Sequence, residues 1–484
     1  MKKQLPELMF LKSRDGKEGC SLSAPEIADD LCVLAADKLR KDIADFPQLS
    51  EVEIVRHYTN LAHLNHSVDA GFYPLGSCTM KYNPKINEKI ANQPEWNAHP
   101  YSPIHLVQGN LEIMKSLEEL LMKITAMAAF TLTPAAGAHG ELTGLRVIRD
   151  YLTAKGDARK IVLIPDSAHG TNPASSVLCG YQTKEIPSNE NGILEGETLK
   201  KHLDKDVAAL MITNPNTLGI FEKNIVEISR ILHENGSLLY MDGANMNAFM
   251  GIAKPGDLGA DVIHLNLHKT FATPHGGGGP GSGPVGVAKD LVKFLPVPII
   301  THEGKEYKVR YHNESGSNRV KNFYGNFLVI VRALVYLLEL GKENIRQVAE
   351  DAVLNANYIR KKLEPYLDLP YKSKSLHEVI FSDKGLTVKT LDIAKRILDY
   401  GMHPFTIYFP LIVHGAMMIE PTETESKETL DQFIDIMIKI LDEAKKDPAF
   451  VQGAPYSTPV TRLDEVMAAK QLILRWKPAA PQTN

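Results

Sequence analysis

Residues 236–269 contain two short apolar runs, GSLLYMD at 236–242 and DVIHLNLHK at 261–269, joined by one crossover. Three more runs of this kind precede them: AAFTLTP (128–134), KIVLIPD (160–166) and VAALMITNP (207–215). Helical periodicity lies between the runs, as in ELTGLRVIRDYL at 141–152. Strands that alternate with helices predict right-handed βαβ units and an α/β fold with a mainly parallel sheet. Helices on both faces of such a sheet explain why the runs are nearly all apolar.

The sequence changes in character on both sides of this region, which predicts three parts. Residues 1–110 mix Pro, Asn, His and aromatic residues irregularly, and we expect an extended arm on a larger surface, with one helix through 50–65. Residues 111–300 form the large α/β domain. Residues 301–484 contain several helical stretches and the apolar run GAMMIEP at 415–421, which together predict a smaller α+β domain.

Helix signals are clearest in this last part. Gly401 suits the C-terminal cap of a helix through KTLDIAKRILDYG, and Ser426 suits the N-cap of a helix through SKETLDQFIDIMIKILDEAKK. In the second helix one apolar stripe is made by Leu430, Phe433, Ile434, Met437 and Leu441. We expect this stripe to be ordinary core, and a partner-binding face is the alternative.

The composition limits the possible functions. Lys and Arg number 54 against 58 Asp and Glu, a formal net charge of −4, and no long stretch gathers basic residues, so nucleic-acid binding is not expected. Cys20, Cys32, Cys78 and Cys179 lack any C-x-x-C or metal-ligand spacing, so we expect reduced thiols and no metal. The N-terminal apolar run is only LMFL, and no uncharged apolar run approaches about 18 residues. We therefore expect a soluble, unexported, cytoplasmic protein without membrane contact.

Asp242 and Lys269 close the two runs quoted first. Ligands of open α/β sheets bind beyond the carboxyl ends of the strands, so neighbouring strands would place this carboxylate and this amine in one crevice. A partly desolvated lysine is a usable nucleophile toward a carbonyl group. From the spacing alone, a buried ion pair between the two residues explains the pattern equally well.

Three further strand ends favour chemistry. The turn TPAAGAHGELTG would let the backbone N–H groups of Gly137 and Ala138 bind an anion at a helix N-terminus, although a simple tight turn is the alternative. His169 follows KIVLIPD and would stack on an aromatic ligand or move a proton, unless it is only a structural residue. Thr213 and Asn214 would offer a hydroxyl and an amide to a ring oxygen, or would merely cap a turn.

Together these residues predict pyridoxal 5'-phosphate as the cofactor. A pyridine aldehyde with a phosphate needs an amine, a carboxylate that keeps its ring nitrogen protonated, a flat cover and an anion site. Lys269, Asp242, His169 and the 136–140 turn supply all four. The glycines at 276–279 would let backbone approach the cofactor or a facing subunit, and a flexible linker is the alternative.

Five segments closely resemble the glycine dehydrogenase (decarboxylating) family, the P-proteins of the glycine cleavage system. They are GSCTMKYNP (76–84), AHGTNPAS (168–175), DGANMNA (242–248), HLNLHKTFATPHGGGGPGSGPVGV (264–287) and MIEPTETES (418–426). The resemblance runs from about residue 65 to about residue 430 and implies pyridoxal-phosphate fold type I. Many members contain two related halves in one chain. This sequence resembles the carboxyl-terminal half, which in split forms is the catalytic subunit and acts with a companion subunit 1 in a heterotetramer.

The resemblance also implies roles for individual residues. Lys269 corresponds to the lysine that condenses with the cofactor, Asp242 to the partner of the ring nitrogen, and His169 to the histidine that stacks on the ring. Ala244 would pack against the other face of the ring, and His268 would contact the phosphate. Phe405 departs from the family pattern, where we expect a small residue or proline, so the shape of the nearby pocket is expected to differ.

The activity implied is glycine decarboxylation. Glycine would lose CO₂, and its aminomethyl group would pass to the lipoyl arm of the H-protein, with His169 or the Lys269 amine moving the proton. The motif blocks contain no arginine, which fits because a tight clamp on the departing carboxylate would stabilise the ground state. We expect an open tunnel for the long lipoyl-lysine. Two alternatives stay open: another pyridoxal-phosphate enzyme, such as an amino-acid decarboxylase or aldolase, and a degenerate subunit that only scaffolds its partner.

Overall fold

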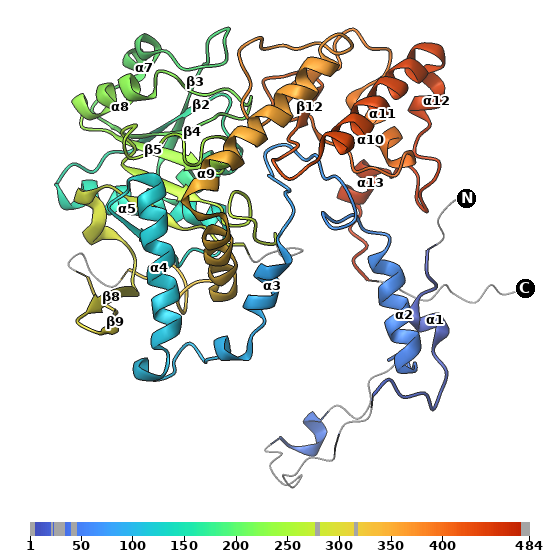
Figure 1. Cartoon of the computed structure of the whole chain (residues 1–484), viewed down its shortest axis with the longest axis horizontal. Coiled ribbons are helices and arrows are strands. Elements are labelled where there is room, and N and C mark those ends of the chain that lie inside the picture. Colours follow the sequence, from blue (N-terminus) through green and yellow to red (C-terminus); the bar gives the residue numbers. More distant parts are fainter. Residues whose placement is uncertain are drawn as a thin grey trace, which may run out of the picture. The chain divides into compact units, whose positions relative to one another are not determined.

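The computed structural model describes residues 5–20, 23, 34–39, 46–275, 281–313 and 318–475 (Figure 1). Its contacts divide the chain into two compact units, Phe72–Gly453 and a smaller one that combines Met1–Gly71 with Ala454–Asn484. The larger unit contains the predicted α/β domain together with residues on both sides of it. The predicted boundaries near residues 110 and 300 stay predictions.

A seven-stranded sheet forms the centre of the larger unit. Its strands are β1 (Ala129–Thr131), β2 (Ile161–Pro165), β3 (Gln182–Ile186), β4 (Val207–Thr213), β5 (Leu238–Gly243), β6 (Val262–Leu265) and β7 (Val285–Val287). The order across the sheet is β1-β7-β6-β5-β4-β2-β3. Strands β3, β2, β4, β5 and β6 are parallel, and β7 runs antiparallel to both β6 and β1. The prediction of a mainly parallel sheet is confirmed.

Helices cover both faces of this sheet, as predicted (Figure 1). Leu239 and Met241 of β5 pack in one core with α4 (Gln108–Thr125), α8 (Ile225–Glu234) and the first part of α9 (Phe327–Leu363). Leu238 and Tyr240 alternate with them and pack in a second core with α5 (Gly137–Ala154). Because successive strand side chains point to opposite faces, the two cores lie on opposite sides of the sheet.

Strands β3 and β7 were not among the predicted strands. β3 is an edge strand whose first four residues are exposed and polar, so it lacks an apolar run. β7 has only three residues and follows a glycine-rich stretch. Neither shows the apolar pattern by which the other strands are recognisable.

A second, three-stranded antiparallel sheet follows, with the order β10 (Val379–Ser382), β12 (Ala416–Ile419) and β11 (Thr406–Ile407). It shares a core with α10 (Thr390–Asp399), α11 (Lys427–Lys446) and α12 (Pro448–Gln452). The apolar stripe of α11 is buried there, so its interpretation as core is confirmed. The Ser426 side chain accepts a hydrogen bond from the Thr429 N–H at 3.2 Å, and Gly401 has φ +77° after α10, so both predicted caps are confirmed.

Helix α9 is two helices that meet at Gly341, whose φ of 61° and ψ of 172° are not helical. This agrees with the several helical stretches expected in residues 301–484. The remaining elements of the larger unit are α3 (Lys85–Ala91), η3 (Pro94–Trp96), η4 (Ile104–Leu106), α6 (Thr171–Leu178), α7 (Gly196–His202), η5 (Met246–Ala248), η6 (Lys289–Phe294) and the hairpin β8 (Ile299–Glu303) and β9 (Glu306–Arg310).

The smaller unit contains α1 (Met9–Lys12), η2 (Ala36–Lys38), α2 (Glu51–Ala62) and α13 (Glu465–Lys470). α2 is the helix predicted in the N-terminal part. It begins at a capping box in which the Ser50 N–H donates to Glu53 Oε2 at 2.9 Å. Among the described residues of the whole chain, no helix is long and apolar enough to cross a membrane.

Candidate active site

A cavity of about 230 Å³ lies where β4, β5 and β6 end and α5 begins. Of the residues predicted for the site, those that line it are Gly137, Ala138, His169, Thr213, Asp242, Ala244, His268 and Lys269. The strand register brings Thr213, Asp242 and His264 side by side on three neighbouring strands. The structure therefore gathers residues that lie more than 130 positions apart in the sequence.

Asp242 is the buried acid of this cavity, with 2% of its surface exposed. Its Oδ1 accepts the Ala244 N–H at 2.9 Å and lies 3.2 Å from His264 Nε2, and its Oδ2 accepts the Asn172 side-chain amide at 3.1 Å. Burial opposes ionisation, yet His264, the Ala244 N–H and Asn172 outweigh it and hold the pKa of Asp242 below its ordinary value. Asp242 is thus a fixed negative charge at neutral pH.

Lys269 lies four residues beyond the end of β6, in the loop that follows the strand rather than at the strand end. Its Nζ donates a 2.8 Å hydrogen bond to the carbonyl oxygen of Ser77. Lys269 and Asp242 line the same cavity, and the carboxylate instead pairs with His264, Asn172 and backbone. Among the described residues no ion pair joins Lys269 to Asp242, so the structure does not show the alternative of a direct ion pair.

His169 is exposed and lines the cavity, with its ring packed edge-on against Phe409 at a centroid distance of 5.5 Å. Its Nδ1 lies 3.2 Å from the Thr171 backbone nitrogen and 2.9 Å from the Thr171 hydroxyl, which itself donates to Glu141 at 2.7 Å. Desolvation and the charge of Lys269 lower the pKa of His169. The ring is therefore neutral at pH 7.

The start of α5 approaches the end of β6 closely. A Cβ on Gly137 would lie 2.5 Å from Asn266 Oδ1, so only glycine fits at this position. The described residues provide no side-chain cap for α5, and its first-turn N–H groups at Gly137 and Ala138 border the cavity. Uncapped N–H groups with a helix dipole behind them suit an anion.

Thr213 and Asn214 behave differently. Thr213 lines the cavity, and its buried Oγ1 has no hydrogen-bond partner among the described residues. Asn214 is fully buried outside the lining, and its Oδ1 accepts the Glu222 N–H at 2.9 Å. The predicted contact of Asn214 with a ligand is therefore not visible here, whereas Thr217, which was not predicted, does line the cavity.

His268 and His275 form a neighbouring pair with ring centroids 5.2 Å apart. Burial, His275 and Lys269 lower the pKa of His268 to about 3, and burial with Lys269 lowers the pKa of His275 to about 4. His268 Nδ1 accepts the Ser282 N–H at 3.3 Å. Both rings are neutral at pH 7, so His268 offers a neutral contact to any anion bound here.

Sequence reasoning missed several lining residues: Ser77, Glu141, Thr171, Thr217, Asn245, His264 and Asn266. His264 had a signal, since it lies on β6 opposite Asp242. Ser77 lies in the family-like segment GSCTMKYNP, but no strand pattern places it at the cavity, because that segment precedes Lys269 by 192 residues. The glycines at 276–279 lie outside the described residues. Phe405, the departure from the family pattern, is buried in the core of the small sheet rather than in the cavity lining.

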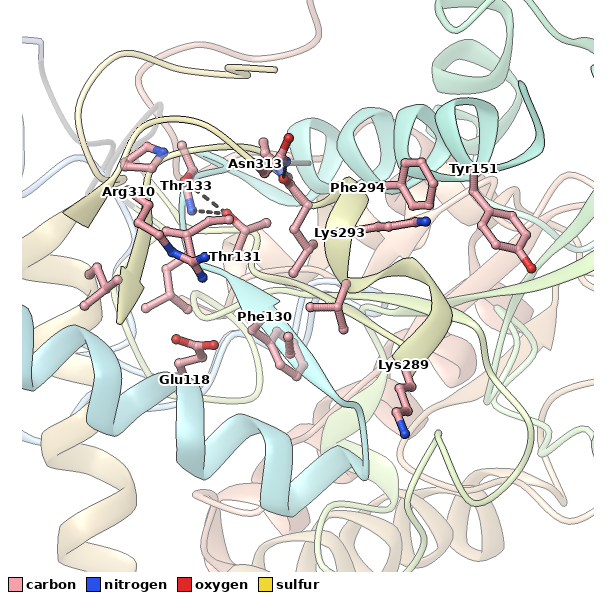
Figure 2. Close-up of a pocket in the computed structure, with 18 of the residues that line it drawn as sticks. Glu118, Phe130, Thr131, Thr133, Tyr151, Lys289, Lys293, Phe294, Arg310 and Asn313 are labelled. Carbon is pink, nitrogen blue, oxygen red and sulfur yellow. Dashed lines mark hydrogen bonds between the residues drawn. The ribbon is translucent and has the colours of Figure 1, made fainter. Parts of the chain in front are cut away.

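A second cavity, of about 620 Å³, lies beside the edge strand β1 and is lined by none of the predicted residues (Figure 2). Glu118 of α4 and Arg310 at the end of β9 approach it from opposite sides of Thr131 (Figure 2). It is larger than the first cavity, and among the described residues none of its lining side chains has a buried polar atom without a hydrogen-bond partner. The residues predicted for the chemistry line the smaller cavity instead.

Comparisons with known proteins identify the family of the chain. A family profile described as glycine cleavage system P-protein matches residues 26–311, and one described as glycine dehydrogenase, C-terminal domain matches residues 348–452. The chain is 53% identical to a protein of Kosmotoga olearia named probable glycine dehydrogenase (decarboxylating) subunit 2, over 97% of this chain and 99% of the relative. Identity to the protein of that name from Bacillus cytotoxicus is 54%, over 99% of both chains.

Solved structures support the fold. The crystal structure of glycine decarboxylase (P-protein) of the glycine cleavage system, in inhibitor-bound form, superposes with a TM-score of 0.72 at 18% identity, over 85% of this chain and 94% of the other. Alanine–glyoxylate aminotransferase from Nostoc sp. gives 0.57 at 16%, over 77% and 95%. The predicted pyridoxal-phosphate fold type I is confirmed. With a P-protein profile covering more than half of the chain and full-length relatives above 50% identity, this chain belongs to the P-protein family of the glycine cleavage system.

Proposed function

We propose that the 230 Å³ cavity binds pyridoxal 5'-phosphate through Lys269 and that this chain is the glycine-decarboxylating subunit of a glycine cleavage system. One observation carries the proposal. An amine, an ionised acid and a neutral imidazole (Lys269, Asp242 and His169) line one cavity at the carboxyl edge of a parallel sheet, next to an uncapped helix N-terminus. No simpler ligand requires all of these groups together.

The residues present fit this cofactor. The uncapped start of α5 suits a phosphate, and the close approach of Gly137 to Asn266 keeps side chains out of that position. The unpartnered Thr213 hydroxyl is placed to meet a polar group of the ring. Asp242 would hold the ring nitrogen protonated, and Ala244 and His169 line the cavity where they would contact the ring. When bound, pyridoxal phosphate supplies an electron sink for the electron pair left by departing CO₂.

The chain's own groups divide the proton chemistry. Asp242 is held ionised by His264, Asn172 and the Ala244 N–H, so its charge does not depend on the substrate. His169 is neutral and exposed where it lines the cavity, and there it would transfer a proton. The Lys269 amine, once released, is the second candidate for proton transfer.

Glycine is the proposed substrate. The described lining of the cavity contains no arginine, so no guanidinium holds a carboxylate tightly. Weak binding of the carboxylate suits a reaction in which that group leaves as neutral CO₂, because a strong clamp would stabilise the ground state most. We further propose that the aminomethyl group passes to the lipoyl arm of the H-protein through an open tunnel, and that a companion subunit 1 completes the assembly with two copies of each subunit.

The first test is cofactor binding. The purified chain, titrated with pyridoxal phosphate, should develop the absorbance band of a lysine-bound cofactor near about 420 nm. Lys269→Ala should abolish the band, whereas Lys200→Ala, on exposed α7, should leave it unchanged. A wild-type chain that stays colourless would contradict the proposal.

The second test is the reaction itself. Together with its companion subunit, the chain should catalyse glycine-dependent exchange of labelled CO₂ only when lipoylated H-protein is present. Exchange without H-protein would favour a simple decarboxylase. Exchange that survives Lys269→Ala would place the catalytic amine elsewhere and leave this chain a scaffold.

A further inference from the structure

Two buried glutamates lie beneath the turn that contacts Lys269. Glu378 immediately precedes β10 and Glu420 immediately follows β12, and these strands pair antiparallel with Val379 opposite Ile419. Both glutamates are completely buried, as is His377 beside them. His377 Nε2 lies 3.9 Å from Glu378 Oε1 and 4.0 Å from Glu420 Oε1.

The two carboxyl groups hold the turn from Ser77 to Thr79. The Ser77 N–H donates to Glu378 Oε2 at 2.8 Å, and the Thr79 N–H donates to Glu420 Oε2 at 3.0 Å. The Thr79 hydroxyl donates to Glu420 Oε1 at 2.5 Å. Ser77 and Thr79 both have positive φ, +63° and +45°, which side-chain-bearing residues adopt only when their surroundings hold them there.

This turn in turn presents a group to the active-site lysine. The carbonyl oxygen of Ser77, between the two held N–H groups, accepts the 2.8 Å hydrogen bond from Lys269 Nζ. A shift of either glutamate therefore moves the acceptor that orients Lys269. Ser77 is 301 residues from Glu378, and Thr79 is 341 residues from Glu420, so only the folded chain makes these contacts.

The pair cannot carry two negative charges without compensation. Two adjacent, fully buried carboxylates repel each other, so one of them keeps its proton. His377 does not neutralise the pair, because burial and Lys269 lower its pKa to about 3. Neither ring nitrogen of His377 has a hydrogen-bond partner among the described residues.

The hydrogen bonds distinguish the two glutamates. Glu420 accepts from both the N–H and the hydroxyl of Thr79, which favours its ionised form. Glu378 accepts a single N–H, and its Oε1 has no partner among the described residues, so fewer donors stabilise its ionised form than that of Glu420. Burial and the charge of Glu420 raise the pKa of Glu378 well above its usual value, whereas burial, opposed by Thr79, raises the pKa of Glu420 to about 7.

We propose that Glu378 and Glu420 share a single proton, with Glu378 as the neutral acid and Glu420 as the carboxylate, and that this pair positions the Ser77–Thr79 turn against Lys269. Both are positioning residues, because they act on Lys269 through the turn and through the charge of Glu420. The effect on the cofactor rests on the proposed function, whereas the protonation pattern of the cofactor-free chain does not.

Other titratable groups surround the pair and Lys269. Cys78, His377, Lys269 and Glu423 act on the pair, and the charge of Glu423 is already met by Lys81 at 2.7 Å. The further groups that act electrostatically with Lys269 are His169, Asp242, His268 and His275. The three histidines are neutral, so Glu420 and Asp242 are the two ionised acids among these groups that act on Lys269, and Asp242 also lies 3.2 Å from His264 Nε2.

The test compares two isosteric variants of the full chain. Glu378→Gln keeps the shape and donor capacity of a neutral acid, so cofactor affinity should change less than twofold. Glu420→Gln removes the carboxylate that accepts from Thr79, so affinity should fall tenfold or more. Loss of its negative charge should also lower the pH midpoint of the bound-cofactor absorbance by about one unit. Glu378→Leu, which cannot hold Ser77, should weaken the cofactor as Glu420→Gln does.

Infrared spectra of the cofactor-free chain at pH 8 read the proton directly. The wild type should show the C=O stretch of a buried carboxylic acid, and Glu378→Gln should lose it. Absence of that band from the wild type would overturn the proposal even if a variant failed to fold. The proposal would also be overturned if Glu420→Gln kept its cofactor affinity while Glu378→Gln lost it. One tightly bound metal ion per chain that both variants release would overturn it as well. An acid band with no cofactor binding would refute only the proposed function.

Discussion

Replacing Gly137 with alanine probes a close approach between two elements that line the proposed cofactor cavity. The added Cβ would lie 2.5 Å from Oδ1, 2.9 Å from Nδ2 and 3.0 Å from Cγ of Asn266. An ordinary contact starts near 3.4 Å, so the helix start and the loop after β6 must separate by about 0.9 Å. Asn266 is only 6% exposed and lines the cavity, so a shift of its side chain would change the shape of the cavity.

The expected cost follows from this overlap. Overpacking a well-packed site costs about 1–3 kcal/mol. The loss of glycine's freedom in the unfolded chain offsets about 0.4–1 kcal/mol of it. Gly137→Ala should therefore lower the free energy of unfolding by about 1–2 kcal/mol. Because the displaced N–H groups border the proposed phosphate position, cofactor affinity should fall about tenfold, which corresponds to 1.4 kcal/mol.

Denaturant unfolding of the cofactor-free chain and an absorbance titration with pyridoxal phosphate measure the two effects separately. Gly109→Ala is the matched control, because Gly109 is the second residue of α4 and no atom lies within 4 Å of its added Cβ. It should leave cofactor binding unchanged. Asn266→Ala in the Gly137→Ala background should recover stability by removing the clashing atoms. If Gly137→Ala binds cofactor as tightly as the control, the helix start is not the phosphate site.

Three other perturbations have expected outcomes. Asp242→Asn should keep the cofactor band but lower kcat at least about 100-fold, because an amide cannot hold the ring nitrogen protonated, and steady-state kinetics measure this. Burial raises the pKa of Glu222 to about 7, so its stabilising contribution is present below pH 4.5 and is lost as the pH rises toward 7. The free energy of unfolding should therefore fall by up to about 3 kcal/mol across that range. Denaturant unfolding of Glu222→Gln should show a smaller fall. Lys81→Met should lower the free energy of unfolding by about 3–5 kcal/mol, measured with denaturant, because Glu423 loses its buried partner. The double variant Lys81→Met/Glu423→Gln should lose less stability. Equal losses in the two variants would contradict the pairing.

Much of the large sheet could be predicted from the sequence because parallel strands are buried on both faces. Their apolar runs are therefore visible without any knowledge of their neighbours, as in the run that ends at Asp242. β3 escaped because an edge strand with exposed Gln182, Thr183, Lys184 and Glu185 looks like a loop. In the folded chain β3 is held by its pairing with β2 over its whole length rather than by an apolar run of its own.

A site residue could be predicted where it follows an apolar strand directly, and could not be predicted where only tertiary contacts bring it to the site. Asp242, His169 and Thr213 follow apolar runs directly, so their place at the sheet edge follows from the fold. Ser77 comes from an irregular segment and Glu420 from the end of a strand in the small sheet, both more than 150 residues from Lys269 in the sequence. Asn214 shows the limit of the rule, because its strand end points into the protein and its side chain holds the Glu222 N–H.

The contact between Thr79 and Glu420 sets when during synthesis the site is complete. These residues are 341 positions apart, so the ribosome must release nearly the whole chain before the turn acquires its anchor. A nascent chain that already contains Lys269 and its strands still lacks the carboxylate that holds Ser77 in place. A chain that ends before residue 420 therefore has no Glu420 to accept the hydrogen bonds of Thr79.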